Sequence, residues 1–94
     1  MDIAKTLTTL RRNFHQFPEL GFCEDQTKHT ISKFLRNLDF EVHEGCGVVG
    51  VLRNGKSNRC IGLRADMDAL PILETSGHEY ASQIKGAMHA CGHD

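Results

Sequence analysis

The first forty residues carry apolar spacings typical of helices. One set recurs at positions i, i+4, i+7 and i+11: Ile3, Leu7, Leu10 and Phe14. This spacing places the side chains on one face of a helix. The helix should end near His15, because Pro18 disfavours helical geometry at Phe17.

A second helix should follow the PELG turn, since Glu24 and Asp25 suit the positive N-terminus of a helix. Its apolar face would consist of Thr27, Ile31, Phe34, Leu35 and Leu38.

After Asp39 the pattern changes to that of strands. The segment FEVHE alternates with period two, and VVGVLR, residues 48–53, predicts a second strand. Asn54-Gly55 is a strong hairpin signal, and RCIGLRA, residues 59–65, predicts a third strand. This third strand is apolar nearly throughout, which is typical of a strand covered on both faces. The pattern therefore predicts an α/β layer with helices packed on a sheet. From Asp66 onward we expect a long loop with a short strand near Met88.

Composition narrows the class of protein. The chain has 94 residues, 39% of them hydrophobic and 24% charged, with a formal net charge of -1. These values exclude a disordered chain and a nucleic-acid binder, and they allow one domain at most. No apolar run approaches the roughly 20 residues that span a bilayer, and no signal peptide is recognised. We therefore expect a cytoplasmic protein with reduced thiols, and predict Cys23, Cys46 and Cys60 to be small buried apolar residues.

The last residues, MHACGHD, gather groups that bind metal ions. In an extended backbone, Cys91 and His93 would point to the same side, and Gly92 would allow a tight turn. Thiolate and imidazole together suit zinc. Asp94 adds a carboxylate that could bridge two metals, and His89 lies close enough to contribute. The alternative is that a lone C-x-H pair has no metal role and that histidines near a chain end are solvated.

A second cluster follows the predicted third strand. Asp66 and Asp68 lie where ligand sites occur in open α/β sheets, beyond the carboxyl end of a strand. They could bind a cation or orient a metal-bound histidine. The alternative is that Asp66 caps a turn or pairs with Arg64 while Asp68 is solvated.

The remaining histidines receive no catalytic role. His15 opens the segment HQFPELG, in which proline and glycine predict a turn and Glu19 would satisfy backbone donors. We interpret this segment as structural. His29, His43 and His78 have no recognisable partner pattern.

Three segments together resemble the M20 metallopeptidases, in particular their amidohydrolase branch. RRNFHQFPELGFCEDQT resembles the family's R-x-x-x-H-x-x-P-E-L-G-x-x-E-x-x-T, GLRADMDALPILE its L-R-A-D-M-D-A-L-P, and GAMHACGHD its M-H-A-C-G-H-D. The resemblance extends in register from about Leu10 to Asp94. The amidohydrolase branch of the family includes hippurate hydrolases, N-acyl-amino-acid amidohydrolases, indoleacetyl-amino-acid hydrolases and N-acetyl-diaminopimelate deacetylases.

The resemblance implies an enzyme that cleaves the amide bond of small N-acyl amino acids with a metal-activated water. Cys91 and His93 would be metal ligands, Asp94 a bridging ligand, and Asp68 the predicted catalytic carboxylate, which supports a metal-bound histidine. Zinc is favoured because thiolate is a soft ligand, with manganese, cobalt or nickel as alternatives. The implied fold is an α/β/α catalytic domain with a smaller lid, and a homo-oligomeric full-length parent is expected.

The chain differs from members of the family in its length. Residues 1–94 correspond to the N-terminal part of the catalytic domain, with two helices, three short strands and a long loop. The adjacent Glu-Glu pair that supplies the general base, the further histidines and the lid have no counterpart in it. We therefore predict no amidase activity for the 94-residue chain alone. The alternatives are a small metal-binding module or a non-catalytic partner from a truncated gene.

Overall fold

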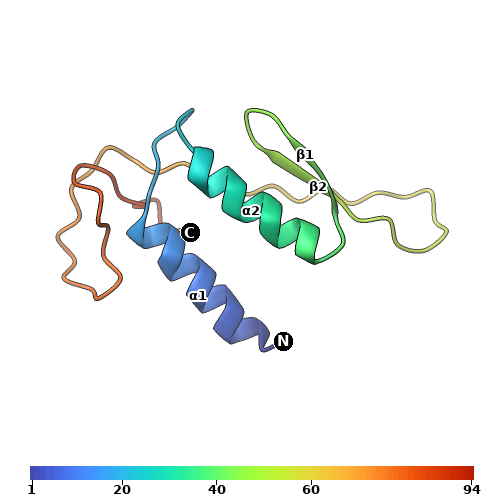
Figure 1. The fold of residues 1–94 in the computed structure, drawn as a ribbon, viewed down its shortest axis with the longest axis horizontal. Helices are drawn as coiled ribbons and strands as arrows, with labels where there is room; N and C mark the ends of the chain where they lie inside the picture. The colour runs from blue at the N-terminus through green and yellow to red at the C-terminus, as the bar shows by residue number, and fades with distance from the viewer. The chain divides into compact units, whose positions relative to one another are not determined.

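The structure is a computed structural model that describes residues 1–94, which form two compact units. The first unit comprises residues 1–27 and 67–94, and the second comprises residues 28–66. Figure 1 shows the elements in chain order: α1 (Ile3–Gln16), α2 (Asp25–Asn37), β1 (Glu41–Glu44) and β2 (Val48–Val51).

Helix α1 confirms the first predicted helix. Asp2 is its N-cap, and the Asp2 carboxylate accepts a hydrogen bond of 3.1 Å from the backbone N–H of Lys5, which satisfies one of the otherwise unpaired donors of the first turn. The helix ends at Gln16, as Pro18 predicts. Its apolar stripe is largely open, since Ile3 is 67% exposed and Leu7 58% exposed. The one buried side chain of α1 is His15.

Glu19 caps the start of α2 in the first unit. Its carboxylate accepts hydrogen bonds from the Thr27 N–H (2.6 Å), the Thr27 hydroxyl (2.7 Å) and the Gln26 N–H (3.2 Å). Burial opposes the charged form, but these hydrogen bonds outweigh it and hold the pKa of Glu19 below its ordinary value. The prediction that Glu19 satisfies backbone donors is thus confirmed.

The segment 67–94 is tied back to the rest of the first unit by a few backbone contacts. The Ala69 N–H donates to the Glu19 carbonyl over 2.8 Å, and Leu70 and Met88 exchange two hydrogen bonds of 2.9 Å. The Leu70–Met88 pair is an isolated antiparallel bridge. The short strand predicted near Met88 is therefore present only as this single bridge. Ala69 and Ala87 are buried beside these contacts. The loop that carries residues 89–94 therefore leaves from a fixed point.

The second unit is a hairpin on a helix. Strands β1 and β2 pair antiparallel, with Glu41 opposite Val51 and Glu44 opposite Val48. A Cβ atom added at Gly50 would lie 3.0 Å from Leu35 Cδ1, so the hairpin packs closely on the end of α2. Glycine is required there because a larger side chain would displace its neighbours.

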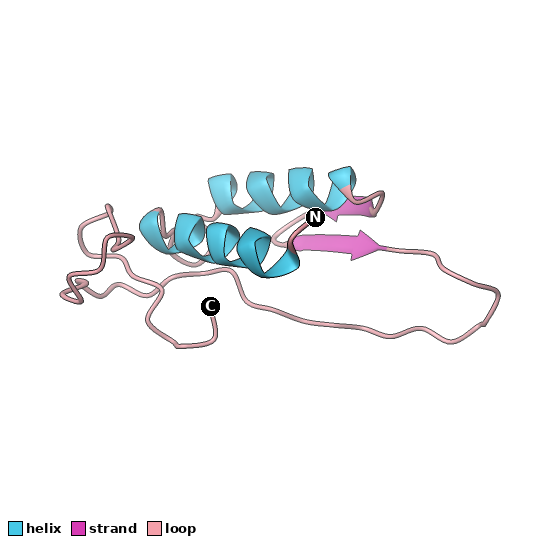
Figure 2. Cartoon of the chain, turned by 90° about the horizontal axis from the view of Figure 1, so that it is seen from below, coloured by secondary structure: helices cyan, strands magenta, loops and turns pink.

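The predicted third strand is wrong for this structure. Residues 52–68 contain neither helix nor strand, as the loop after β2 in Figure 2 shows. Asn54-Gly55 forms a turn, with Gly55 at φ +79°, but no hairpin follows it. Ile61 is 87% exposed and Leu63 is 96% exposed. An apolar strand is stable only when it has both a neighbouring strand and covering faces, and this segment has neither.

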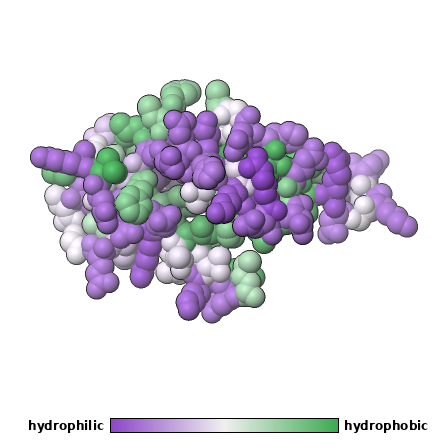
Figure 3. Space-filling view, in the orientation of Figure 1, coloured by the Kyte–Doolittle hydropathy of each residue, from purple (hydrophilic) through white to green (hydrophobic).

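The sequence predicted buried cysteines, and this is also wrong. Cys23, Cys46, Cys60 and Cys91 are all free thiols and exposed. The buried hydrophobic core consists of Ala69 and Ala87, so no large core exists to hold the thiols. Figure 3 accordingly shows hydrophobic residues open on the face it draws. Neither helix has the length and hydrophobicity to cross a bilayer.

Candidate metal centre

The Cys-Gly-His segment is a turn. Gly92 has φ +88°, a left-handed conformation that glycine adopts without steric cost. The extended geometry expected for residues 91–93 is therefore wrong, whereas the glycine turn is confirmed. Cys91 and His93 are both exposed on this turn.

The donor set is incomplete as a metal site. Thiolate and imidazole are the ligand types that zinc prefers, and both are on the Cys91–His93 turn. The structure nevertheless contains no group of three or more His, Cys, Asp or Glu side chains arranged to hold a metal ion. A catalytic zinc site needs three protein ligands and an open position. The residues present fit part of such a centre.

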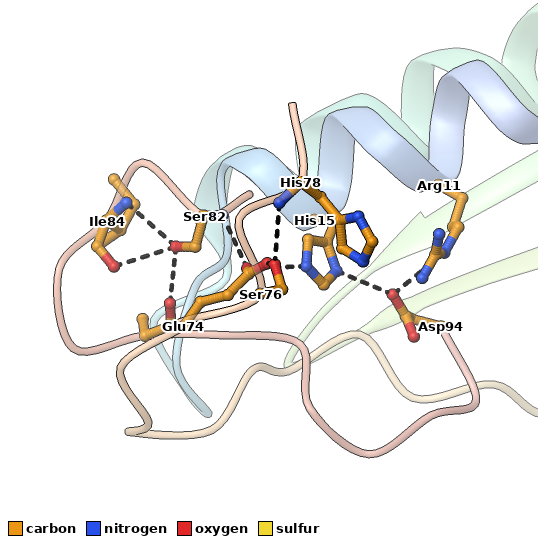
Figure 4. A network of polar contacts seen from close by, with 9 residues as sticks. Arg11, His15, Glu74, Ser76, His78, Ser82, Ile84 and Asp94 are labelled. Carbon is orange, nitrogen blue, oxygen red and sulfur yellow. Dashed lines mark hydrogen bonds and ion pairs between the residues drawn. The ribbon is translucent and has the colours of Figure 1, made fainter. Parts of the chain in front are cut away.

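Asp94 is fixed by helix α1. Its Oδ2 lies 3.2 Å from His15 Nδ1 and 3.4 Å from Arg11 Nε. Burial opposes the charged carboxylate, but these two partners lower the pKa of Asp94 below its ordinary value. The side chain directly after His93 is thus attached to the last turns of α1 (Figure 4).

His15 also contacts a second carboxylate. Its Nε2 lies 2.8 Å from Glu74 Oε1, and the two side chains are 5% and 2% exposed. Figure 4 shows the imidazole projecting from α1 between Glu74 and Asp94. A neutral imidazole has one N–H, so only the imidazolium can donate to both carboxylates. His15 therefore bridges Asp94 and Glu74 through its two ring nitrogens.

Glu74 contacts three other residues of the first unit: His15, Ser76 and Ser82. Its Oε1 accepts a hydrogen bond of 2.8 Å from the Ser82 N–H, and its Oε2 accepts one from the Ser76 hydroxyl. The Ser82 hydroxyl donates in turn to the Ala87 carbonyl over 2.7 Å. Burial raises the pKa of Glu74, but the hydrogen bonds and His15 outweigh it, and the pKa lies below its ordinary value. Residues 74–87 are thereby organised around one charged group.

His89 lies among these groups without a hydrogen-bond partner for its buried Nε2. Burial lowers the pKa of His89, although Asp94 and Asp68 oppose the change. His89 lines a pocket of about 240 Å³ together with His15, Asp94 and others. An imidazole nitrogen at a pocket wall is available to a further group.

The structure separates the two aspartates that the sequence grouped. Asp66 pairs with Arg64 at 2.9 Å on the surface. This is the pairing that the sequence offered as the alternative to a role for Asp66 in cation binding. Asp68 is exposed and lies beside Gly21, where an added Cβ would be 3.7 Å from Asp68 Oδ2. Asp68 and Asp94 both influence His89 electrostatically, so Asp68 lies in the neighbourhood of the C-terminal turn.

The sequence missed the partners of His15. Glu74 and Arg11 gave no pattern that would connect them with Asp94, and His15 was interpreted as structural. Tyr80 was also missed: His78 stacks on its ring at 5.0 Å, and the Arg12 guanidinium lies 4.6 Å from its centroid. The H-x-x-P-E-L-G spacing was the one available signal, because it sets His15 on the end of α1.

Comparison with known proteins shows similarity to one family of peptidases. Residues 62–94 match peptidase family M20/M25/M40. The chain is 46% identical over 97 residues to thermostable carboxypeptidase 2 of Saccharolobus solfataricus and 44% identical to the hippurate hydrolase of Campylobacter jejuni. These matches cover 99% and 100% of the chain but 25% of each relative. The chain is therefore similar to hydrolases of the M20 family and matches an N-terminal portion of the M20 peptidase fold.

Solved structures agree with this assignment. The Bacillus subtilis YXEP protein, described as a dinuclear metal binding peptidase of the M20 family, superposes with a TM-score of 0.88 at 35% identity. The match covers 95% of this chain and 26% of that protein. The α/β fold class is thus confirmed, and the chain spans about a quarter of the length of the relatives it matches.

Proposed function

We propose that this chain contributes part of the active site of a metal-dependent amidohydrolase that cleaves the amide bond of N-acyl amino acids. The observation that carries the proposal is the Cys91–Gly92–His93 turn, whose neighbour Asp94 is fixed by His15 and Arg11. Relatives named hippurate hydrolase and N-acetyldiaminopimelate deacetylase support the substrate class. A divalent ion held there would polarise the scissile carbonyl and activate a water molecule.

The residue roles follow from donor chemistry. Cys91 and His93 would be ligands, and Asp94, whose Oδ2 is engaged by α1, would use its second carboxylate oxygen toward the metal. Asp68 would orient a metal-bound histidine, as carboxylates commonly do. Zinc is favoured by the thiolate, with manganese, cobalt or nickel as alternatives. The relative described as dinuclear supports a site for divalent ions.

The 94-residue chain alone should lack this activity. Residues 1–94 offer no group of three His, Cys, Asp or Glu side chains that could hold a metal ion, whereas a catalytic zinc site needs three protein ligands. The general base, the remaining ligands and the lid would come from the part of the relatives' length that residues 1–94 do not cover. The longer protein is proposed to act in the cytoplasm as a homo-oligomer on a small-molecule substrate, without nucleic acid or membrane.

A direct test is to measure amide hydrolysis of N-benzoyl- and N-acetyl-amino acids by the purified chain with added Zn²⁺, Mn²⁺ or Co²⁺. We expect rates equal to those of the metal ions in buffer. The chain should nevertheless bind Co²⁺ through Cys91, with a thiolate charge-transfer band that Cys91→Ala removes. Metal-dependent turnover by the 94 residues would show that the active site is complete here. A Cys91→Ala variant that binds Co²⁺ like the native chain would contradict the ligand assignment.

A further inference from the structure

His15 is buried at a position where an apolar side chain would be expected. The exposed fractions of Ile3 and Leu7 on the same helix are 67% and 58%, whereas that of His15 is 4%. Burying an imidazole between two carboxylates requires desolvation of all three groups. A well-packed apolar residue would give similar stability at less cost. Stability alone therefore does not explain why residue 15 is a histidine. Its imidazole should make contacts that an apolar side chain cannot make.

Geometry supplies such a role. His15 joins Glu74 and Asp94, which are 59 and 79 residues away in the sequence, through its two ring nitrogens. Arg11, one turn earlier on α1, contacts the same Oδ2 of Asp94 at 3.4 Å. Residues i and i+4 of a helix lie on the same face, so a single face of α1 holds the end of the C-terminal turn.

The segment that carries the proposed ligands has contacts with the rest of the first unit on both sides of Cys91 and His93. It begins at Met88, which exchanges two backbone hydrogen bonds with Leu70. It closes at Asp94, which His15 and Arg11 hold. Cys91 and His93 lie between these two points and are themselves exposed. Release of either end would leave the two ligands to be ordered by the metal alone, at a cost in conformational entropy.

We propose that His15 is a positioning residue of the metal centre: through Asp94 it holds the Cys91–His93 turn in the conformation that receives the metal. This inference rests on the proposed function, because it concerns the same site. His15 does not touch the metal or the substrate, and Arg11 assists it from the preceding turn of α1.

The experiment is a Co²⁺ titration of the 94-residue chain, followed by the thiolate charge-transfer band, with helix content measured by circular dichroism. We expect His15→Phe to lower Co²⁺ affinity by about 10- to 100-fold, as loss of groups that orient metal ligands commonly does. His29→Phe is the matched control, because His29 is an exposed histidine on α2. It should bind Co²⁺ like the native chain. Equal affinity for His15→Phe and the native chain would overturn the inference.

A double-mutant cycle separates positioning from a general structural role. If His15 acts through Asp94, His15→Phe should add little to the loss of affinity caused by Asp94→Ala. Additive losses would show that His15 affects the turn by another route and would overturn the inference. Failure of the proposed function has a different signature, since Cys91→Ala would then bind Co²⁺ like the native chain.

Arg11 provides a second test should His15→Phe lose its helices. Arg11→Met removes the other contact to Asp94 at a side chain that is 43% exposed, and should weaken Co²⁺ binding several-fold. Arg12→Met is its control, because Arg12 lies over the Tyr80 ring at 4.6 Å and has no described contact with Asp94. Equal affinities for Arg11→Met, Arg12→Met and the native chain would overturn the inference.

Discussion

His15 Nε2 lies 2.8 Å from Glu74 Oε1, and the two side chains are almost completely buried although 59 residues separate them in the sequence. The pair joins the end of α1 to the loop that precedes the Cys-Gly-His turn. Glu74 also accepts hydrogen bonds from Ser76 and Ser82. This buried contact therefore links α1 both to residues 74–87 and, through His15 and Asp94, to the candidate site.

Replacement of Glu74 should destabilise the first unit. Glu74→Gln keeps the shape of the side chain but removes the charge that His15 and the Ser82 N–H face. The expected loss in free energy of unfolding is about 2 kcal/mol, the scale of hydrogen bonds to a charged group. Urea unfolding followed by far-ultraviolet circular dichroism measures it. Glu79→Gln, an exposed carboxylate in the same loop, is the control and should change stability little.

Glu19 makes the stability of the α2 cap depend on pH. Its pKa in the folded chain is below the ordinary value of 4.5. A lowered folded pKa gives stability that is present above pH 4.5 and is lost as the pH falls through the folded pKa. Glu19→Gln should therefore be less stable than the native chain at neutral pH, and the difference should shrink in acid. Urea midpoints between about pH 3 and pH 7 measure this. A difference that stayed constant over this range would contradict the capping role.

Gly92 tests whether the turn itself matters for metal binding. Gly92→Ala places a side chain at φ +88°, where an L-residue is strained by roughly 1–2 kcal/mol. We expect weaker Co²⁺ binding, because the turn would relax away from the native conformation. Gly86→Ala is matched to it: Gly86 has φ +85°, and a Cβ there also meets nothing within 4 Å. Isothermal titration calorimetry should show a loss for Gly92→Ala and none for Gly86→Ala.

Local signals in the sequence predicted the local parts of the fold. Pro18 and the acidic start of α2 set helix ends that the structure confirms within a residue or two. The two strands predicted from FEVHE and from residues 48–53 are present as β1, Glu41–Glu44, and β2, Val48–Val51, with the second strand two residues shorter than predicted. Each of these features depends on residues that are close in the sequence. The period of the apolar residues, or a residue that starts or ends a helix, is therefore enough to predict it.

Contacts between distant residues could not be predicted in the same way. Cys91 and His93 were selected by residue type and by the family motif. Nothing in the spacing of His15 and Glu74 indicates that they meet, because a contact between a helix and a distant loop produces no periodic pattern in the sequence. The exposure of the cysteines was missed for a related reason: a small core leaves no place for them.

The predicted third strand gives the last test, because its absence has a physical cause that can be measured. Residues 59–65 have the apolar pattern of a buried strand, but Ile61 and Leu63 are 87% and 96% exposed. Backbone amides without a strand neighbour exchange rapidly with solvent. We expect hydrogen exchange of residues 59–65 at nearly unprotected rates, while the amides of α2 exchange more slowly. Protection of residues 59–65 that grows with protein concentration would show that a second chain supplies the missing neighbour.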